Sequence, residues 1–90
     1  MSKLKLIELS APWCGVCKMI QPTVKRFMDK HPDVEFECLD VETGEGSKVA
    51  DEFNLKTVPT FLFYKDGVCV HKHIGNIALG ELEIKLNELK

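Results

Sequence analysis

The feature that most constrains the fold is a pair of cysteines, Cys14 and Cys17, at the junction between two segments of different periodicity. Residues 4–9 first alternate and then become mainly apolar, which predicts a strand entering a covered sheet. After the pair, apolar residues recur at helical spacing as far as Lys30. We therefore expect the strand to position Cys14 at the N-terminus of a helix.

That position gives the cysteines a chemistry. A helix N-terminus presents unpaired backbone N–H groups and the positive end of the helix dipole. Both favour the thiolate, so they lower the pKa of a cysteine placed there, and the thiolate is the form that attacks disulfides. We expect Cys14 to be the nucleophile, and Cys17, one turn later on the same face, to complete the exchange.

Two alternative interpretations, in which cysteines and histidines bind a metal, have less support in the sequence than thiol exchange. The pair Cys14 and Cys17 is half of a zinc site, but a structural zinc needs four ligands and Cys38 and Cys69 stand alone in the sequence. Cys69, His71 and His73 alternate on one face of a predicted strand, but no fourth ligand is evident. We expect no metal and no other cofactor.

Composition narrows the class of protein. The chain has 90 residues, which predicts one domain over residues 1–90, and its 44% hydrophobic and 29% charged residues match a globular protein. The net charge of -2 argues against nucleic acid or an anionic membrane as a partner. The N-terminus is typical of a strand rather than a signal peptide, and four cysteines are too few for a disulfide scaffold. We expect a cytoplasmic monomer.

The first half of the chain predicts a strand, a helix and a second strand. The helix over residues 14–30 contains Pro22, which either kinks one helix or separates two. The strand over residues 34–41 places Cys38 on a face with apolar neighbours, where we expect it to be buried. These strands should be parallel, joined by a right-handed crossover.

The second half predicts a helix, a hairpin and a last helix. Residues 43–47 are expected to be a loop that ends at an N-cap, Ser47, followed by a short helix that stops at Asn54. Residues 61–64 are apolar on both faces and should form a central strand. A hairpin turn at residues 65–67 leads to a strand over residues 68–74, whose apolar face carries Val68, Val70 and Ile74. Leucines at helical spacing mark the last helix.

The expected fold class is therefore α/β. The order β-α-β-α-β-β-α is satisfied by one mixed four-stranded sheet flanked by three helices.

At this point the residues resemble the thioredoxin family. Residues 13–18 (Trp-Cys-Gly-Val-Cys-Lys) look like its active-site motif, and residues 58–60 (Val-Pro-Thr) look like its cis-proline loop. The family pattern is also matched, in order and spacing, by Pro22, by the turn at residues 66–67 and by Gly75. The chain resembles a minimal thioredoxin that opens on the strand before the active site. It departs from the usual pattern in having Val16 between the cysteines, and in having Cys38 in place of a buried lysine.

The resemblance implies roles for further residues. Glu8 occupies the position of the family's buried acid, where it would take the proton of Cys17. Periodicity alone also allows the less favoured alternative of a surface charge on an edge strand. Pro59 is expected to follow a cis bond, with the Val58 backbone pairing with a bound peptide. The expected substrate-binding residues around Cys14 are Trp13, Gly15, Val16, Val58, Pro59 and Gly75, with Ile77 either among them or in the core.

The function implied is that of a thiol-disulfide oxidoreductase that reduces protein disulfides and is recycled by a flavin-dependent thioredoxin reductase. A second interpretation is a glutaredoxin-like enzyme that uses glutathione. Trp13, and the lack of a Gly-Gly pair after the last strand, argue against it. A third is a non-catalytic binding module of the same fold, which the presence of both cysteines disfavours.

Overall fold

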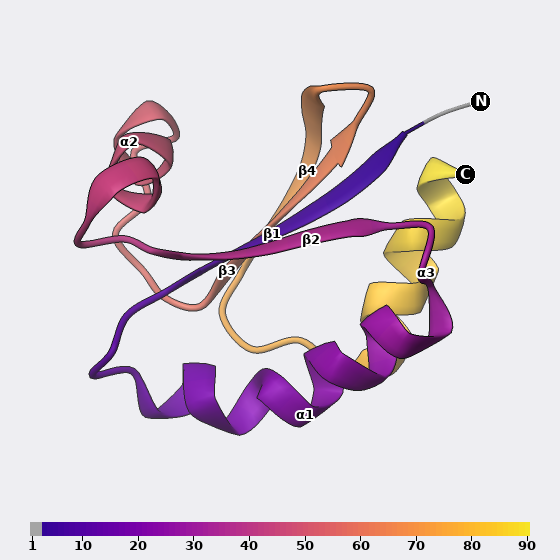
Figure 1. The fold of residues 1–90 in the computed structure, drawn as a ribbon, viewed down its shortest axis with the longest axis horizontal. Helices are drawn as coiled ribbons and strands as arrows, with labels where there is room; N and C mark the ends of the chain where they lie inside the picture. Colours follow the sequence, from indigo (N-terminus) through magenta and orange to yellow (C-terminus); the bar gives the residue numbers. More distant parts are fainter. Residues whose placement is uncertain (1–2) are drawn as a thin grey trace.

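A computed structural model describes residues 3–90. The elements follow in the expected order (Figure 1): β1 Leu4–Ser10, α1 Gly15–Lys30, β2 Glu35–Asp40, α2 Gly44–Glu52, β3 Thr60–Lys65, β4 Val68–Ile74 and α3 Leu79–Leu89. The helix α1 runs without interruption through Pro22, so the alternative of two separate helices is wrong. Helix α2 stops as expected, with Asn54 in the left-handed conformation at φ 53°.

The four strands form one mixed sheet in the order β2-β1-β3-β4. Strand β1 is parallel to β2 and antiparallel to β3, and β4 pairs antiparallel with β3. The expected fold class is confirmed, and so is the central position of the apolar strand at residues 61–64, since β3 lies between β1 and β4. Strand β1 is central as well, and its C-terminal end leads directly to the cysteine pair.

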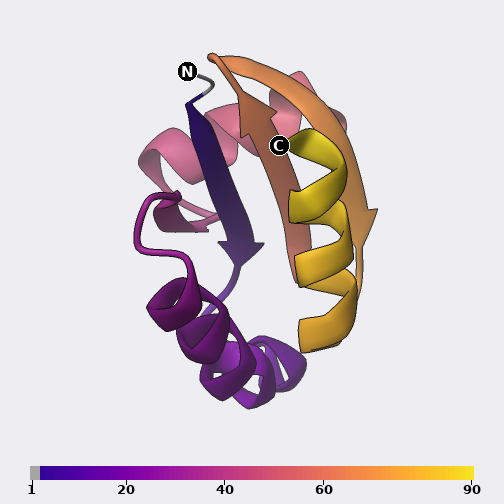
Figure 2. The same ribbon diagram turned by 90° about the vertical axis from the view of Figure 1, so that its right-hand side faces the viewer.

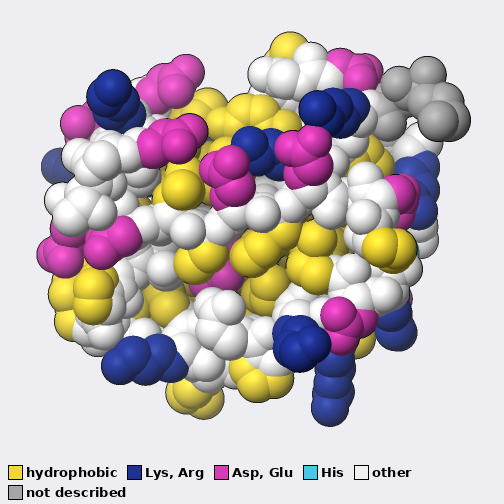
Figure 3. All heavy atoms as spheres, in the orientation of Figure 1, with side chains coloured by type: hydrophobic (Ala, Val, Ile, Leu, Met, Phe, Trp, Pro, Cys, Tyr) yellow, Lys and Arg dark blue, Asp and Glu magenta, His cyan; other side chains and the backbone are white. Residues whose placement is uncertain are grey.

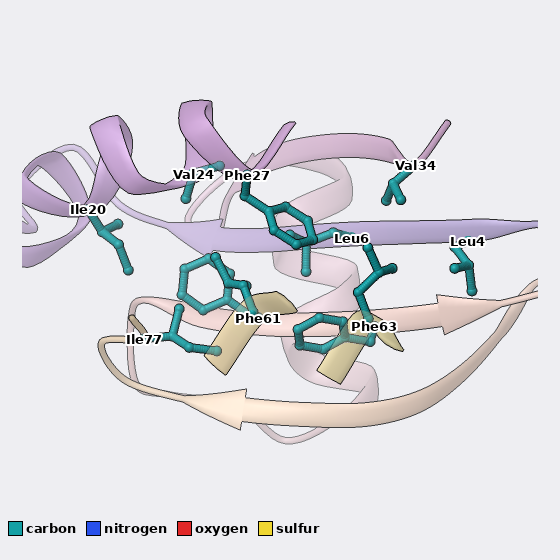
Figure 4. Packing of buried hydrophobic residues seen from close by; sticks show 11 residues of the cluster. Leu4, Leu6, Ile20, Val24, Phe27, Val34, Phe61, Phe63 and Ile77 are labelled. Carbon is teal, nitrogen blue, oxygen red and sulfur yellow. The ribbon is translucent and has the colours of Figure 1, made fainter. Parts of the chain in front are cut away.

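Helices cover both faces of the sheet. Helices α1 and α3 pack on one face with Leu4, Leu6 and Phe61, and α2 packs on the other face with Ile7 and Leu9. Figure 2 shows α2 behind the sheet and α3 in front of it. Figure 4 shows the first of these cores in detail, where side chains of α1 meet those of β1 and β3. Successive residues of β1 thus contribute to opposite cores, as the two-residue period of a strand requires.

The start of α2 differs from the expectation. The helix begins at Gly44 with Thr43 as its N-cap, so the predicted loop at residues 43–47 is largely helical and Ser47 is not the N-cap. Gly46 is buried, and a Cβ atom there would overlap the backbone carbonyl of Asp40 at the end of β2. Two glycines in the segment indicated a loop, but one of them permits close packing of the helix against β2.

The hairpin between β3 and β4 also corrects an expectation. Its turn is as predicted, with Asp66 at φ 53° and Gly67 at φ 85°. A register shift at Phe63/Tyr64, however, pairs Tyr64 with Cys69 and Phe63 with His71. Because adjacent residues of β3 face opposite sides, Cys69 and His71 lie on opposite faces of the sheet rather than on one. The bulge cannot be predicted from the alternation of residues alone.

One further expectation about an edge strand is wrong. Strand β2 is at one edge of the sheet, and Cys38 on it is exposed rather than buried. Strand β4 is at the other edge, and the residues of its predicted apolar face, Val68, Val70 and Ile74, are exposed. An edge strand has a neighbour on one side alone, so apolar alternation there does not guarantee burial.

Candidate active site

Cys14 is the N-cap residue of α1, as the sequence predicts. Its Sγ accepts a hydrogen bond from the backbone N–H of Cys17 at 3.1 Å, so the sulfur satisfies one of the free donors at the helix start. Cys14 and Cys17 are joined as a disulfide, with their Cα atoms 5.3 Å apart. Their exposed fractions are 6% and 3%. The first turn carries no acidic residue that would oppose a thiolate.

Glu8 is fully buried, at 0% exposure, on the α1 side of the sheet, where it contacts Gln21 of α1. The alternative of a surface charge on an edge strand is therefore wrong. Its carboxylate accepts hydrogen bonds from Gln21 Nε2 at 3.1 Å (Oε1) and 3.0 Å (Oε2). Burial raises the pKa of Glu8, and the hydrogen bond from Gln21 lowers it by a smaller amount.

The loop before β3 lies against the cysteines. The peptide bond between Val58 and Pro59 is cis, as expected, and Val58 packs on the cluster formed by Ala11, Cys14 and Cys17. Gly75 donates its N–H to the carbonyl of Pro59 at 2.7 Å and has φ 95°, which favours glycine. The structure thus places Val58 beside the disulfide, and Pro59 and Gly75 beside each other.

Apolar side chains are exposed around the start of α1. Trp13 is 67% exposed, and its Nε1 donates a hydrogen bond to Glu42 Oε2 at 3.0 Å. Val16 and Met19 are 44% and 78% exposed, and hydrophobic side chains protrude over α1 along the lower edge of Figure 3. A Cβ at Gly15 would meet no neighbouring atom within 4 Å, so this position is open. These residues form an exposed apolar surface beside the start of α1.

Ile77 does not belong to this surface. It is buried in the core with Phe61 and Leu82, and Figure 4 shows it beside Phe61. Of the two interpretations of Ile77, as a substrate-binding residue or as a core residue, the second is therefore correct. Ile77 follows Gly75 in the segment that joins β4 to α3, and this segment lies on the α1 side of the sheet.

Three residues of this region were missed by sequence reasoning. Met19 belongs by spacing to the apolar stripe of α1 but faces outward, and Glu42 and Gln21 are polar residues without a motif. Gln21 has a signal in hindsight, since it lies one helical turn after Cys17 and so on the same side of α1. The contact between Glu42 and Trp13 joins positions distant in sequence, and no local pattern indicates it.

The two free cysteines differ from Cys14. Cys38 Sγ lies 3.4 Å from Ser10 Oγ, and Cys69 Sγ lies 3.7 Å from the carbonyl of His71. Partial burial raises the pKa of both thiols and is the largest cause in each. Neither sulfur caps a helix, so neither has the environment that favours a thiolate.

Comparison with known proteins agrees with this geometry. The profile of the thioredoxin family matches residues 1–88. The chain belongs to the thioredoxin family. It is 42% identical over 89 residues to thioredoxin H2 of Arabidopsis thaliana, covering 99% of this chain and 65% of that protein. It is 40% identical over 74 residues to a thioredoxin of Ophiophagus hannah, covering 82% of this chain and 69% of that protein.

Solved thioredoxin structures share the fold. Thioredoxin NaTrxh from Nicotiana alata superposes with a TM-score of 0.86 at 39% identity, covering 98% of this chain and 74% of that one. Oxidised mitochondrial thioredoxin 3 from Saccharomyces cerevisiae superposes with a TM-score of 0.84 at 36% identity, covering 97% of this chain and 79% of that one. The chain thus spans about two thirds of the two curated thioredoxins. None of the helices in residues 3–90 is both long and apolar enough to cross a bilayer.

Proposed function

We propose that this chain is a thiol-disulfide oxidoreductase that reduces protein disulfides by dithiol exchange. The observation that carries the proposal is the position of Cys14, whose sulfur caps α1 and accepts the N–H of Cys17, its disulfide partner. In the reduced protein the same N–H would stabilise a thiolate at Cys14. Membership of the thioredoxin family supports this reading over the glutaredoxin-like alternative.

The reaction has two exchanges. The Cys14 thiolate attacks one sulfur of the substrate disulfide, the substrate S–S bond breaks, and the other substrate sulfur leaves as a thiolate. Cys17 then loses its proton and attacks Cys14 Sγ, which breaks the mixed disulfide and releases the second substrate thiolate. The protein is left oxidised, with the Cys14–Cys17 bond of the present structure, and the substrate is left as a dithiol.

We assign the proton acceptor in the second exchange to Glu8. Its carboxyl is buried, and Gln21 links it to the backbone carbonyl of Cys17. Burial raises the pKa of Glu8 toward the range in which a carboxylate is an effective base near neutral pH. In this assignment Glu8 acts after the initial attack and has no part in it.

The substrate would lie across the exposed surface beside Cys14. Trp13 and Val16 offer apolar contact, Gly15 leaves room for a close approach, and Val58 next to the disulfide has backbone groups available for strand-like pairing. Pro59 and Gly75, joined by their backbone hydrogen bond, would form the part of this surface next to Val58. This combination suits an extended segment of a disulfide-containing protein.

The electron donor is proposed to be a flavin-dependent thioredoxin reductase, with glutathione as the alternative. A thioredoxin-type reductant acts in a reducing compartment, so we place the chain in the cytoplasm, as a monomer.

Insulin reduction tests the proposal. With dithiothreitol as the electron source, the wild type should accelerate the appearance of insulin-chain turbidity, and Cys17→Ser should instead accumulate a mixed disulfide through Cys14. Failure of the folded, reduced wild type to accelerate the reaction would favour a non-catalytic binding module. Turnover with NADPH and thioredoxin reductase, compared with glutathione and glutathione reductase, identifies the reductant.

The role of Glu8 is tested separately. Glu8→Gln should slow the second exchange on the order of 100-fold, as expected for loss of a general base, and leave the first exchange nearly unchanged. An unchanged lifetime of the mixed disulfide in this variant would contradict the assignment.

A further inference from the structure

The buried carboxyl of Glu8 is satisfied by an amide. Gln21 Nε2 donates to both of its oxygens, at 3.1 and 3.0 Å, and lies 3.0 Å from the backbone carbonyl of Cys17. No ion pair within residues 3–90 involves Glu8. A neutral side chain therefore provides the polar contacts that a buried carboxylate would otherwise take from a cation.

Other groups facing Glu8 do not supply a positive charge. On β2, Cys38 is opposite Glu8, and burial raises the pKa of that thiol, which stays neutral at neutral pH. Asp40, two residues later on the same side of β2, carries a negative charge. On β3, Phe61 is opposite Glu8, and beyond it on β4 His73 contacts the carbonyl of Asn76 at 2.8 Å. The amide of Gln21 is thus the main group on this side that favours an ionised Glu8.

The orientation of the Gln21 amide favours the ionised form of Glu8 over the protonated form. Its nitrogen faces three acceptors, two on the carboxylate and one on the backbone of Cys17. A protonated Glu8 would need an acceptor for its O–H, and the amide oxygen reaches it only if the amide turns over. The turned amide would then place its oxygen against the carbonyl oxygen of Cys17, where two acceptors repel. The contact with Cys17 therefore fixes the amide in the orientation that suits the carboxylate.

We propose that Gln21 is a positioning residue that keeps Glu8 ionised and directed at Cys17, and thereby sets the pH above which the mixed disulfide is resolved. The inference rests on the proposed role of Glu8 as the base for Cys17. In that step the Glu8 carboxylate accepts the thiol proton of Cys17 while the Cys17 sulfur bonds to Cys14 Sγ and the substrate sulfur leaves. Gln21 transfers no proton.

The variant Gln21→Met tests the proposal. Gln21 itself is exposed, so the substitution is tolerated at the surface, and methionine is long enough to keep Glu8 covered while it removes the N–H donors. The matched control is Asn87→Met, which removes another exposed amide, from α3. Both variants are made in the Cys38→Ser/Cys69→Ser background, so that Cys14 and Cys17 are the thiols that react.

The first measurement is the titration of Glu8 by carbon-13 NMR of its side-chain carboxyl, assigned with Glu8→Gln. The pKa of Glu8 should rise on the order of one unit in Gln21→Met, through loss of hydrogen bonds to the charged form, and stay unchanged in the control. An unchanged pKa in Gln21→Met overturns the proposal.

The second measurement is stopped-flow reaction of the reduced protein with 5,5′-dithiobis(2-nitrobenzoic acid). The first thionitrobenzoate released reports attack by Cys14, and the second reports resolution by Cys17. In Gln21→Met the pH of half-maximal resolution should rise with the pKa of Glu8, and the first release should keep its pH profile. If the pKa rises but the resolution profile does not move, the assignment of Glu8 as the base is wrong, and the proposal fails with it.

Discussion

On the side of the sheet that α1 and α3 cover, β1 contributes Leu4, Leu6 and then Glu8, whereas on the side that α2 covers it contributes Ile7 and Leu9. Both sides are closed to solvent by helices, yet one buries a carboxyl group, which is unfavourable among apolar side chains. The Gln21 amide links that carboxyl to the backbone carbonyl of Cys17. In the proposed mechanism, burial of this carboxyl on the α1 side lowers stability but provides the base for the exchange, whereas the α2 side contributes packing alone.

The largest expected effect is on the α1 side. Cys14→Ser should reduce insulin turnover to the rate of dithiothreitol alone, because the attacking sulfur is lost. Cys69→Ser, on the α2 side, is the matched control and should retain turnover within about twofold, since that thiol has no role in the exchange. Loss of turnover in a folded Cys69→Ser protein would break the division between the two sides.

Thiol reactivity is a second test of the difference between the α1 side and the α2 side. At neutral pH, iodoacetamide should alkylate Cys14 of the reduced protein at least about tenfold faster than Cys69, because a difference of one pKa unit changes the thiolate fraction about tenfold. Burial raises the pKa of Cys69, which increases the difference. Mass spectrometry of quenched samples measures both rates. Equal rates would show that the start of α1 does not activate its cysteine.

A change on the α2 side should alter stability alone. Gly46→Ala places a methyl group against the Asp40 carbonyl and should lower the free energy of unfolding by about 1–3 kcal/mol. Gly80→Ala, on α3, is the control, since a Cβ there meets no neighbour within 4 Å. Denaturant unfolding measures the effect. The alkylation rate of Cys14 should be unchanged, and a large change in it would couple the two sides.

The smallest effect expected is a pH-dependent gain in stability. The pKa of Glu8 is raised in the folded protein, so the folded state keeps the proton to higher pH than the unfolded state. Stability therefore falls as pH rises from the ordinary glutamate pKa through the folded pKa. Glu8→Gln should raise the melting temperature at neutral pH, with the difference vanishing in acid, where both states hold the proton. A gain independent of pH would contradict this origin.

The sequence determined most of the fold and the centre of the site. Apolar periodicity placed the seven elements, and the position of Cys14 between a strand and a helix followed from the change of period. The turn at Asp66 and Gly67 and the stop at Asn54 were readable because each needs a positive φ that few residues adopt. These features are local, since each depends on residues close in the chain.

Tertiary structure decided what depends on contacts between distant segments. The edge position of β2 left Cys38 exposed, and the register shift at Phe63/Tyr64 separated Cys69 from His71. The close approach of Gly46 to Asp40 accompanies the early start of α2. The central position of β1 turned Glu8 from a possible surface charge into a buried group held by Gln21. Burial and hydrogen bonding are set by neighbours in space, and the local pattern of residues 34–41 did not show that this strand lies at the edge of the sheet.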